Sequence, residues 1–99
     1  MPRRRKDKID SNQPDIVAAL REIPGVTVET GKDDILVGFK DIAGIPRTLW
    51  YEIKEPGTVG KDGTIRDSEI TNSQYYLRKT WKGHYRIVWN IDQIIEDLK

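Results

Sequence analysis

Residues 48–54, with the sequence TLWYEIK, constrain the fold of this chain more than any other segment, because they alternate like a strand with two unlike faces. One face would carry Leu49, Tyr51 and Ile53. The other would carry Trp50, Glu52 and Lys54, with the Cα atoms of the last two roughly 6.5–7 Å apart. A carboxylate and an amine so placed, with a carboxylate from an adjacent strand, can hold a divalent cation and act on its water. The alternative interpretation is the solvent face of an ordinary antiparallel strand.

Length and composition predict one globular domain. The chain has 99 residues, of which 33% are charged and 36% hydrophobic, enough for a single modest core. No apolar run is long enough to span a bilayer, and the basic N-terminus lacks the apolar stretch of a signal peptide, so we expect no membrane association. The absence of cysteine excludes disulfides and zinc–thiolate sites and is compatible with a cytoplasmic location.

Charge is distributed unevenly along the chain. Residues 1–8 carry five basic side chains and one acidic one, whereas the remainder carries twelve basic and fifteen acidic ones. We expect residues 1–10 to form a flexible basic arm and residues 11–99 to form the domain. A basic arm on a slightly acidic body suits a protein that meets phosphate backbones. A frayed, solubilising terminus would have the same composition.

The hydrophobic pattern predicts an α/β domain with the element order αβββαβ and a short closing helix. The expected helices span 12–23, 71–81 and 92–98, and the expected strands span 26–29, 35–39, 47–54 and 85–89. Short turns should join the first three strands into an antiparallel meander. A crossover through the second helix should make the fourth strand parallel to the third, giving a four-stranded mixed sheet flanked by helices. Residues 55–69 should form a long loop with a small hairpin at Asp62-Gly63.

Two helix starts carry capping signals. Ser11 or Asn12 can cap the first helix. The second helix opens with Thr71-Asn72-Ser73-Gln74, a capping box in which Thr71 is the N-cap and Gln74 reaches back to the cap amide. Gln74 also lies on the helical stripe that should face the sheet. It can therefore act as a cap, as a polar group above the second face of the third strand, or as both.

These motifs, in this order and at this spacing, resemble the PD-(D/E)xK nuclease superfamily, and within it the small VRR-NUC type domains of phage and bacterial proteins. The matching segments are NQPDIV at 12–17, GKDDILVG at 31–38, WYEIK at 50–54, TNSQ at 71–74 and WKG at 81–83. The similarity covers nearly the whole chain. Asp33 stands where the family usually has proline, which makes it a rival to Asp34, but the family register favours Asp34.

The resemblance implies a restriction-endonuclease-like fold and hydrolysis of DNA phosphodiester bonds with Mg²⁺ or Mn²⁺ as cofactor. Asp34, Glu52 and the backbone carbonyl of Ile53 would be the metal ligands. Lys54 would orient the attacking water, assist its deprotonation or stabilise the transition state. Gln74 would position Lys54 or the water. DNA is the implied partner, with selectivity for a structure such as a junction, flap or single strand, and a homodimer is a further expectation because relatives that resolve junctions pair up.

Several other residues are weaker candidates. Asp15 stands where related enzymes often have glutamate and would serve a second metal site. His84, the only histidine, is expected to be a surface or packing residue, which argues against histidine metal clusters and Ser-His-Asp hydrolysis. Trp50 is expected in the core or an interface, or stacked on a base. The basic residues proposed to contact nucleic acid are Arg3, Arg4, Arg5, Lys6, Lys61, Arg66, Lys79 and Lys82.

Two other classes of function stay open from the sequence. A non-catalytic nucleic-acid-binding or assembly module could keep the same fold, and its binding would be indifferent to a metal chelator. A purely structural α/β protein would bind no DNA even at low salt.

Overall fold

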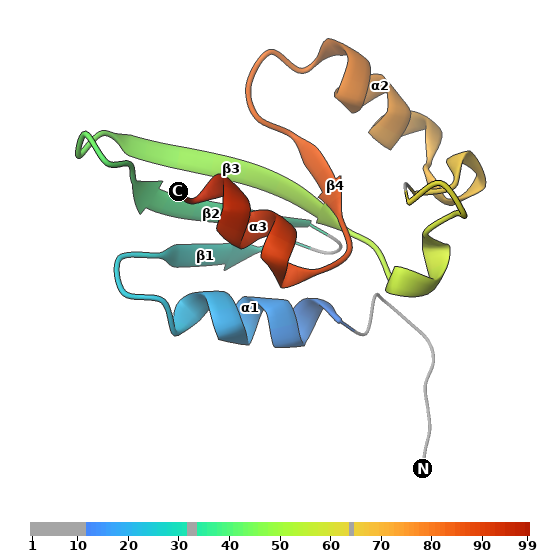
Figure 1. The fold of residues 1–99 in the computed structure, drawn as a ribbon. Coiled ribbons are helices and arrows are strands. Elements are labelled where there is room, and N and C mark those ends of the chain that lie inside the picture. The colour runs from blue at the N-terminus through green and yellow to red at the C-terminus, as the bar shows by residue number, and fades with distance from the viewer. Residues whose placement is uncertain (1–11, 32–33, 64) are drawn as a thin grey trace.

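The computed structural model describes residues 12–31, 34–63 and 65–99, which form an α/β domain (Figure 1). Its helices are α1 (Gln13–Arg21), α2 (Asn72–Thr80) and α3 (Ile91–Asp97), and its strands are β1 (Thr27–Thr30), β2 (Asp34–Lys40), β3 (Pro46–Ile53) and β4 (Arg86–Val88). The predicted order αβββαβ with a closing helix is therefore confirmed. In the described ranges, no helix combines the length and the apolar character that a bilayer span requires.

The four strands form one mixed sheet in the order β1-β2-β3-β4. β1, β2 and β3 pair antiparallel, as expected for a meander with short turns, and β4 pairs parallel to β3 after the crossover through α2. The predicted arrangement of strands is thus confirmed. β1 and β4 are the two edges of the sheet.

One face of the sheet carries the hydrophobic core, covered by α1 and α3 (Figure 1). α1 contributes Ile16, Val17 and Leu20, and α3 contributes Ile94. From β3, the side chains of Tyr51 and Ile53 are fully buried in this core and Leu49 packs against it, so the predicted alternation of β3 holds. Burial of an aliphatic side chain such as that of Ile53 contributes about 1.5–3 kcal/mol, which fixes the face that β3 turns to the core.

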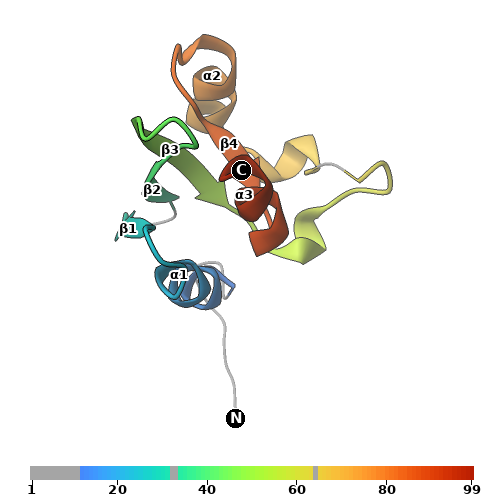
Figure 2. The ribbon, with the colours of Figure 1, turned by 60° about the vertical axis from the view of Figure 1, so that its left-hand side comes forward.

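The other face of the sheet is more open, and α2 stands away from α1 and α3 (Figures 1 and 2). α2 buries none of its side chains: Gln74 and Leu77 are half-buried, and Trp81, which caps the helix at its C-terminus, is exposed. The stripe of α2 that was predicted to face the sheet therefore covers it only in part. Its contact with the sheet includes the ring of Trp81, which lies edge-on to Trp50 of β3.

The loop between β3 and α2 contains two short 3₁₀ turns, Pro56–Thr58 and Asp67–Glu69. Between them, Val59 and Ile65 form an isolated antiparallel bridge, and Gly63 takes a positive φ of 84° at the turn. The small hairpin predicted at this position is therefore present. Ile65 is buried and lines a cavity along β4.

Candidate active site

Asp34 and Glu52 lie directly opposite each other on β2 and β3. Side chains directly opposite in an antiparallel pair project from the same face, with Cβ atoms roughly 4.5–5.5 Å apart. Because Tyr51 and Ile53 project into the core, this shared face is the open one. Asp34 is half-buried and Glu52 is only 7% exposed. The structure thus brings together the two carboxylates that the sequence assigned to one site.

The position of the Asp34 carboxylate is set by two neighbours. The indole N–H of Trp50, on the same face of β3, donates a hydrogen bond to Asp34 Oδ2 at 2.9 Å. On its other side, Asp34 Oδ1 lies so close to Gly31 that a Cβ at position 31 would collide with it. Gly31 also donates its backbone N–H to the Asp34 carbonyl at 2.8 Å. The glycine of the segment GKDD is therefore required by the space that the carboxylate occupies.

Aromatic rings border the carboxylate pair on the β4 side. The ring of Trp50 makes edge-to-face contacts with Trp81 at 5.1 Å and with Tyr85 at 4.7 Å between centroids. Burial and the negative charges of Glu52 and Asp34 raise the pKa of Tyr85 to about 12, so its hydroxyl keeps its proton at neutral pH. The sequence pattern did not single out Tyr85, and Trp50 was expected only to pack or to stack.

Lys54 directly follows the last residue of β3, and its backbone is fixed on both sides. Its N–H donates to the Val88 carbonyl at 2.8 Å, and its carbonyl accepts from Asn12 Nδ2 at 3.1 Å. Asn12 Nδ2 also donates to the Trp89 carbonyl at 3.2 Å, so one amide joins the start of α1 to the ends of β3 and β4. The side chain of Lys54 is half-buried. The role of the Ile53 carbonyl as a metal ligand stays a prediction.

The same contacts correct the predicted cap of α1. Asn12 is the N-cap residue, but its side chain makes no cap hydrogen bond. Its Nδ2 donates to the strand ends, and Oδ1, the atom that would accept a cap N–H, has no partner among the described residues. Ser11, the alternative cap, lies outside the described residues, as does Asp33, the rival of Asp34. Asp15 is exposed in the first turn of α1.

Gln74 forms the predicted capping box with Thr71. The Thr71 backbone N–H donates to Gln74 Oε1 at 3.1 Å, and the Gln74 backbone N–H donates to Thr71 Oγ1 at 3.2 Å. The cap role predicted for Gln74 is confirmed. A second role beside Lys54 stays a prediction.

The predicted nucleic-acid contacts are spread over the surface. Lys61 and Lys82 are exposed, and Lys79 lies over the ring of Tyr75 at 5.1 Å. Arg66 donates to the Gly57 carbonyl at 3.0 Å and pairs with Glu69 at 3.6 Å, so it also holds its own loop together. The basic arm and its four predicted contacts, Arg3, Arg4, Arg5 and Lys6, lie outside the described residues.

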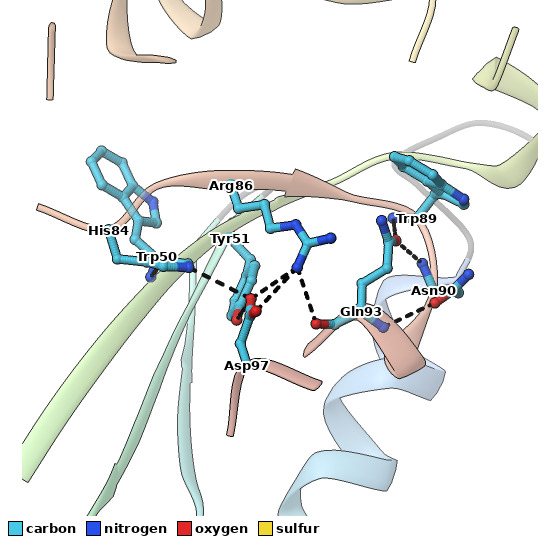
Figure 3. A network of polar contacts seen from close by, with 8 residues as sticks. All are labelled: Trp50, Tyr51, His84, Arg86, Trp89, Asn90, Gln93 and Asp97. Atoms are coloured by element: carbon cyan, nitrogen blue, oxygen red, sulfur yellow. Dashed lines mark hydrogen bonds and ion pairs between the residues drawn. The ribbon is translucent and has the colours of Figure 1, made fainter. Parts of the chain in front are cut away.

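A polar network occupies the core side of β3, opposite the carboxylate pair (Figure 3). Asp97 of α3 accepts from the Tyr51 hydroxyl at 2.6 Å and from Arg86 at 3.1 Å. His84 Nδ1 accepts the backbone N–H of Trp50 at 3.1 Å, and its Nε2 lies 3.7 Å from Asp97. Burial alone would raise the pKa of Asp97, but the Tyr51 hydroxyl and the Arg86 guanidinium hold it below its ordinary value. His84 is therefore a hydrogen-bonded packing residue, whose bonds the sequence did not predict.

The Asp34–Glu52 pair has the donor chemistry of a site for a hard divalent cation. Mg²⁺ prefers oxygen ligands and typically takes one or two carboxylates, with its other positions left to water and substrate. Within the described ranges, no three His, Cys, Asp or Glu side chains gather into a metal-binding group, so Asp15 is not drawn into the pair. A hollow of about 650 Å³ at the other end of the sheet is lined by Phe39, Lys40 and Arg47 among others and has no acidic side chain, so it offers no comparable chemistry.

Comparisons with family models, with curated proteins and with solved structures found no match to this chain.

Proposed function

We propose that this chain is a Mg²⁺- or Mn²⁺-dependent DNA nuclease with a PD-(D/E)xK-type site. The observation that supports this proposal most is the register of β2 and β3, which sets Asp34 opposite Glu52 on the open face. Lys54 follows at the same end of the sheet, in the Glu-x-Lys spacing that the superfamily uses. The order αβββαβ, with β3 and β4 parallel, is the order that a restriction-endonuclease-like fold requires.

The residues of the pair have distinct roles in this proposal. Asp34, Glu52 and the Ile53 carbonyl would hold Mg²⁺ or Mn²⁺, which when bound polarises the phosphate and neutralises charge that develops on it. The indole of Trp50 keeps one Asp34 oxygen in a fixed direction, so the carboxylate needs no reorganisation when a ligand arrives.

In this proposal, Lys54 would bring a compact positive charge to the two carboxylates. Its backbone is anchored through Val88 and Asn12, which limits the positions that the ammonium group can reach. An ammonium group is a point charge with three donors, and its pKa can be lowered by its surroundings, so it can orient or deprotonate water as well as stabilise the transition state. An arginine would supply charge but stays protonated.

A cleavage assay with matched variants tests the proposal. We expect Glu52→Ala and Lys54→Ala to lower the cleavage rate by about 100-fold or more, and Glu96→Ala and Lys40→Ala, which remove the same charges from exposed positions elsewhere, to leave it unchanged. EDTA should abolish cleavage, and Mn²⁺ should bind the parent chain but not Glu52→Ala. If folded Glu52→Ala and Lys54→Ala cut as fast as the parent, the nuclease assignment is wrong.

DNA is the proposed substrate, and a panel of labelled single strands, flaps, nicked duplexes and four-way junctions would define the structure that is cut.

The second candidate function, nucleic-acid binding without turnover, is favoured by one feature. Residues 70–91 contain four basic and no acidic side chains, together with five of the eight aromatic residues of the chain. Basic and aromatic side chains together suit single-stranded nucleic acid. Binding that EDTA leaves unchanged, with no cleavage of any DNA, would favour this second function.

The predicted homodimer is part of the proposal. On α2, Tyr75 and Tyr76 are 54% and 67% exposed, and such rings suit an interface between two copies. Light scattering on the purified chain, with and without Tyr76→Ala, tests it. A mass equal to one chain at all concentrations would contradict a homodimer.

A further inference from the structure

A cavity of about 440 Å³ lies along the free edge of β4, beside the carboxylate pair. It is lined by Arg78 of α2, by Ile65 of the loop hairpin, by Ile87 and Arg86 of β4 with their flanking residues Tyr85 and Trp89, and by Gln93 of α3. Its volume falls in the range of small-molecule sites, roughly 300–1,000 Å³. The proposed nuclease site does not use this cavity or Arg78.

Two hydrogen-bond donors that line the cavity, one buried and one exposed, have no acceptor in the described part of the chain. The Tyr85 hydroxyl oxygen is buried and makes no hydrogen bond there. The Arg78 guanidinium makes no ion pair or hydrogen bond with any described residue. Buried polar groups nearly always have a partner, so the unmatched Tyr85 hydroxyl indicates a ligand that brings an acceptor oxygen. The exposed guanidinium of Arg78 lines the same cavity and can donate to the same ligand.

The surroundings favour an anion. Arg78 is a planar donor that matches a phosphate group, and Tyr85 keeps its proton and so can donate to the same oxygens. The segment 70–91, which supplies most of the lining, has no acidic residue. The rest of the lining is mixed: Ile65 and Ile87 are buried and Trp89 is half-buried, while Arg86, which is paired with Asp97, and Gln93 are polar. In a phosphate attached to a flat ring, the phosphate would meet the donors of Arg78 and Tyr85, and the ring would meet the apolar side chains of the lining.

The cavity is adjacent to the carboxylate pair. Ile87 is the β4 partner of Glu52, and the ring of Tyr85 rests on Trp50, which holds Asp34. A phosphate at Arg78 and Tyr85 would therefore belong to a strand that also passes over Asp34 and Glu52.

We infer that this cavity binds one nucleotide of a DNA strand, with its phosphate at Arg78 and the Tyr85 hydroxyl and its unpaired base against Trp89 and the two isoleucines. Its place next to a cut site rests on the proposed nuclease function, but the binding itself does not. An unpaired base is required because a base held in a duplex could not enter the space between α2 and β4. The substrate class is thus DNA with at least one unpaired nucleotide beside the cleaved bond.

The test is binding of thymidine 5′-monophosphate to the full chain in EDTA, followed by NMR or calorimetry, with thymidine and inorganic phosphate as the other two probes. We expect the monophosphate to bind more tightly than either part alone. Arg78→Ala should weaken it about tenfold and Tyr85→Phe about fivefold, because each removes donors to a charged group. Lys40→Ala, a loss of one positive charge at the far end of β2, should leave the affinity unchanged. Circular dichroism controls for folding. Arg78→Lys is a further control, because it keeps the charge but loses the forked geometry of the guanidinium group.

The outcomes separate this inference from the nuclease proposal. Binding of the monophosphate that depends on Arg78 and Tyr85, in a chain that cuts no DNA, would support the cavity and overturn the nuclease. A chain that cuts DNA, but binds the monophosphate no better than inorganic phosphate or equally well in Arg78→Ala and Tyr85→Phe, would overturn the nucleotide site and leave the nuclease standing. No binding of the monophosphate at all would also overturn the inference.

Discussion

Replacing Gly31 by alanine should disturb the candidate site through a single methyl group. The φ of Gly31 lies outside the left-handed region, so alanine can adopt this backbone without strain. Its Cβ, however, would collide with Asp34 Oδ1, and the carboxylate is the part that can move. When it swings away, the 2.9 Å hydrogen bond from the Trp50 indole to Oδ2 is lost. The expected change is therefore a misplaced Asp34 on an otherwise intact hairpin.

The expected cost in stability is small. A hydrogen bond to a charged group is worth about 1.5–3 kcal/mol, and the lower end applies because Asp34 is only half-buried. Glycine to alanine at a compatible backbone returns about 0.4–1 kcal/mol by restricting the unfolded chain. The net loss is about 1 kcal/mol, or about 4–8 °C in melting temperature for a domain of this size. Under the proposed function the expected loss of cleavage is far larger, about 100-fold, because a proposed metal ligand is displaced by about 1 Å.

Thermal unfolding, the indole N–H resonances of the NMR spectrum and a DNA cleavage assay check this prediction together. The matched control is Gly57→Ala, since a Cβ there meets no atom within 4 Å and its φ is also outside the left-handed region. Gly57→Ala should keep the parent's activity and its Trp50 indole signal. If Gly31→Ala leaves that signal in place and cuts within about twofold of the control, the steric account of Asp34 is wrong.

Three further predictions concern the cap and the polar network. Gln74→Ala should lower the free energy of unfolding by about 1 kcal/mol, because the hydrogen bond from the Thr71 N–H is lost. Cleavage per folded molecule should stay unchanged, and a tenfold slower rate per folded molecule would show that Gln74 has a role beyond the cap. Tyr51→Phe removes the 2.6 Å bond to Asp97 and should cost about 1.5 kcal/mol in urea unfolding, and an unchanged midpoint would contradict this. Because the pKa of Asp97 is lowered from 3.8 in the folded chain, the stability from its contacts with Tyr51 and Arg86 is complete above about pH 4 and is lost as the pH falls through the folded value. Asp97→Asn should therefore flatten the acid limb of urea midpoints measured against pH, whereas equal slopes would refute the assignment.

The strand pattern and the turn signals were sufficient to predict the sheet, because each is a local property. Residues 48–54 alternate as predicted, and the short connections leave a meander as the natural arrangement of β1, β2 and β3. The capping box at Thr71 was found in the same way. Asn90-Ile91-Asp92-Gln93 carries the same local signal, and Asn90 and Gln93 form an equivalent box at the start of α3, which the sequence analysis does not predict.

The features that the sequence did not reveal depend on contacts between distant segments. β4 begins only at Arg86, so the backbone N–H of Trp50 donates to the His84 ring instead of to a β4 carbonyl. The other ring nitrogen of His84 faces Asp97 of α3. Neither contact follows from local pattern, since both require the β3–β4 register and the position of α3. The position of Tyr85 depends on the same register, because Arg86 beside Tyr51 puts residue 85 on the Trp50 face. How far α2 stands from the sheet is not encoded in its apolar stripe.

The turn between β2 and β3 sets the geometry of the candidate site from the other end of the hairpin. Asp41 accepts the backbone N–H groups of Ala43 and Ile45 at 2.9 and 3.0 Å, and Gly44 takes a positive φ of 79°, which fixes the loop length between Lys40 and Pro46. Each later pair of the ladder inherits that register, so Asp34 meets Glu52 six residues away, roughly 20 Å along the strands. A slip of one residue would set Asp34 opposite a side chain of the core face and move every side chain of one strand to the wrong side. The two carboxylates therefore meet because the turn at residues 41–45 closes with this length, and the metal proposed for them depends on that turn as much as on the carboxylates.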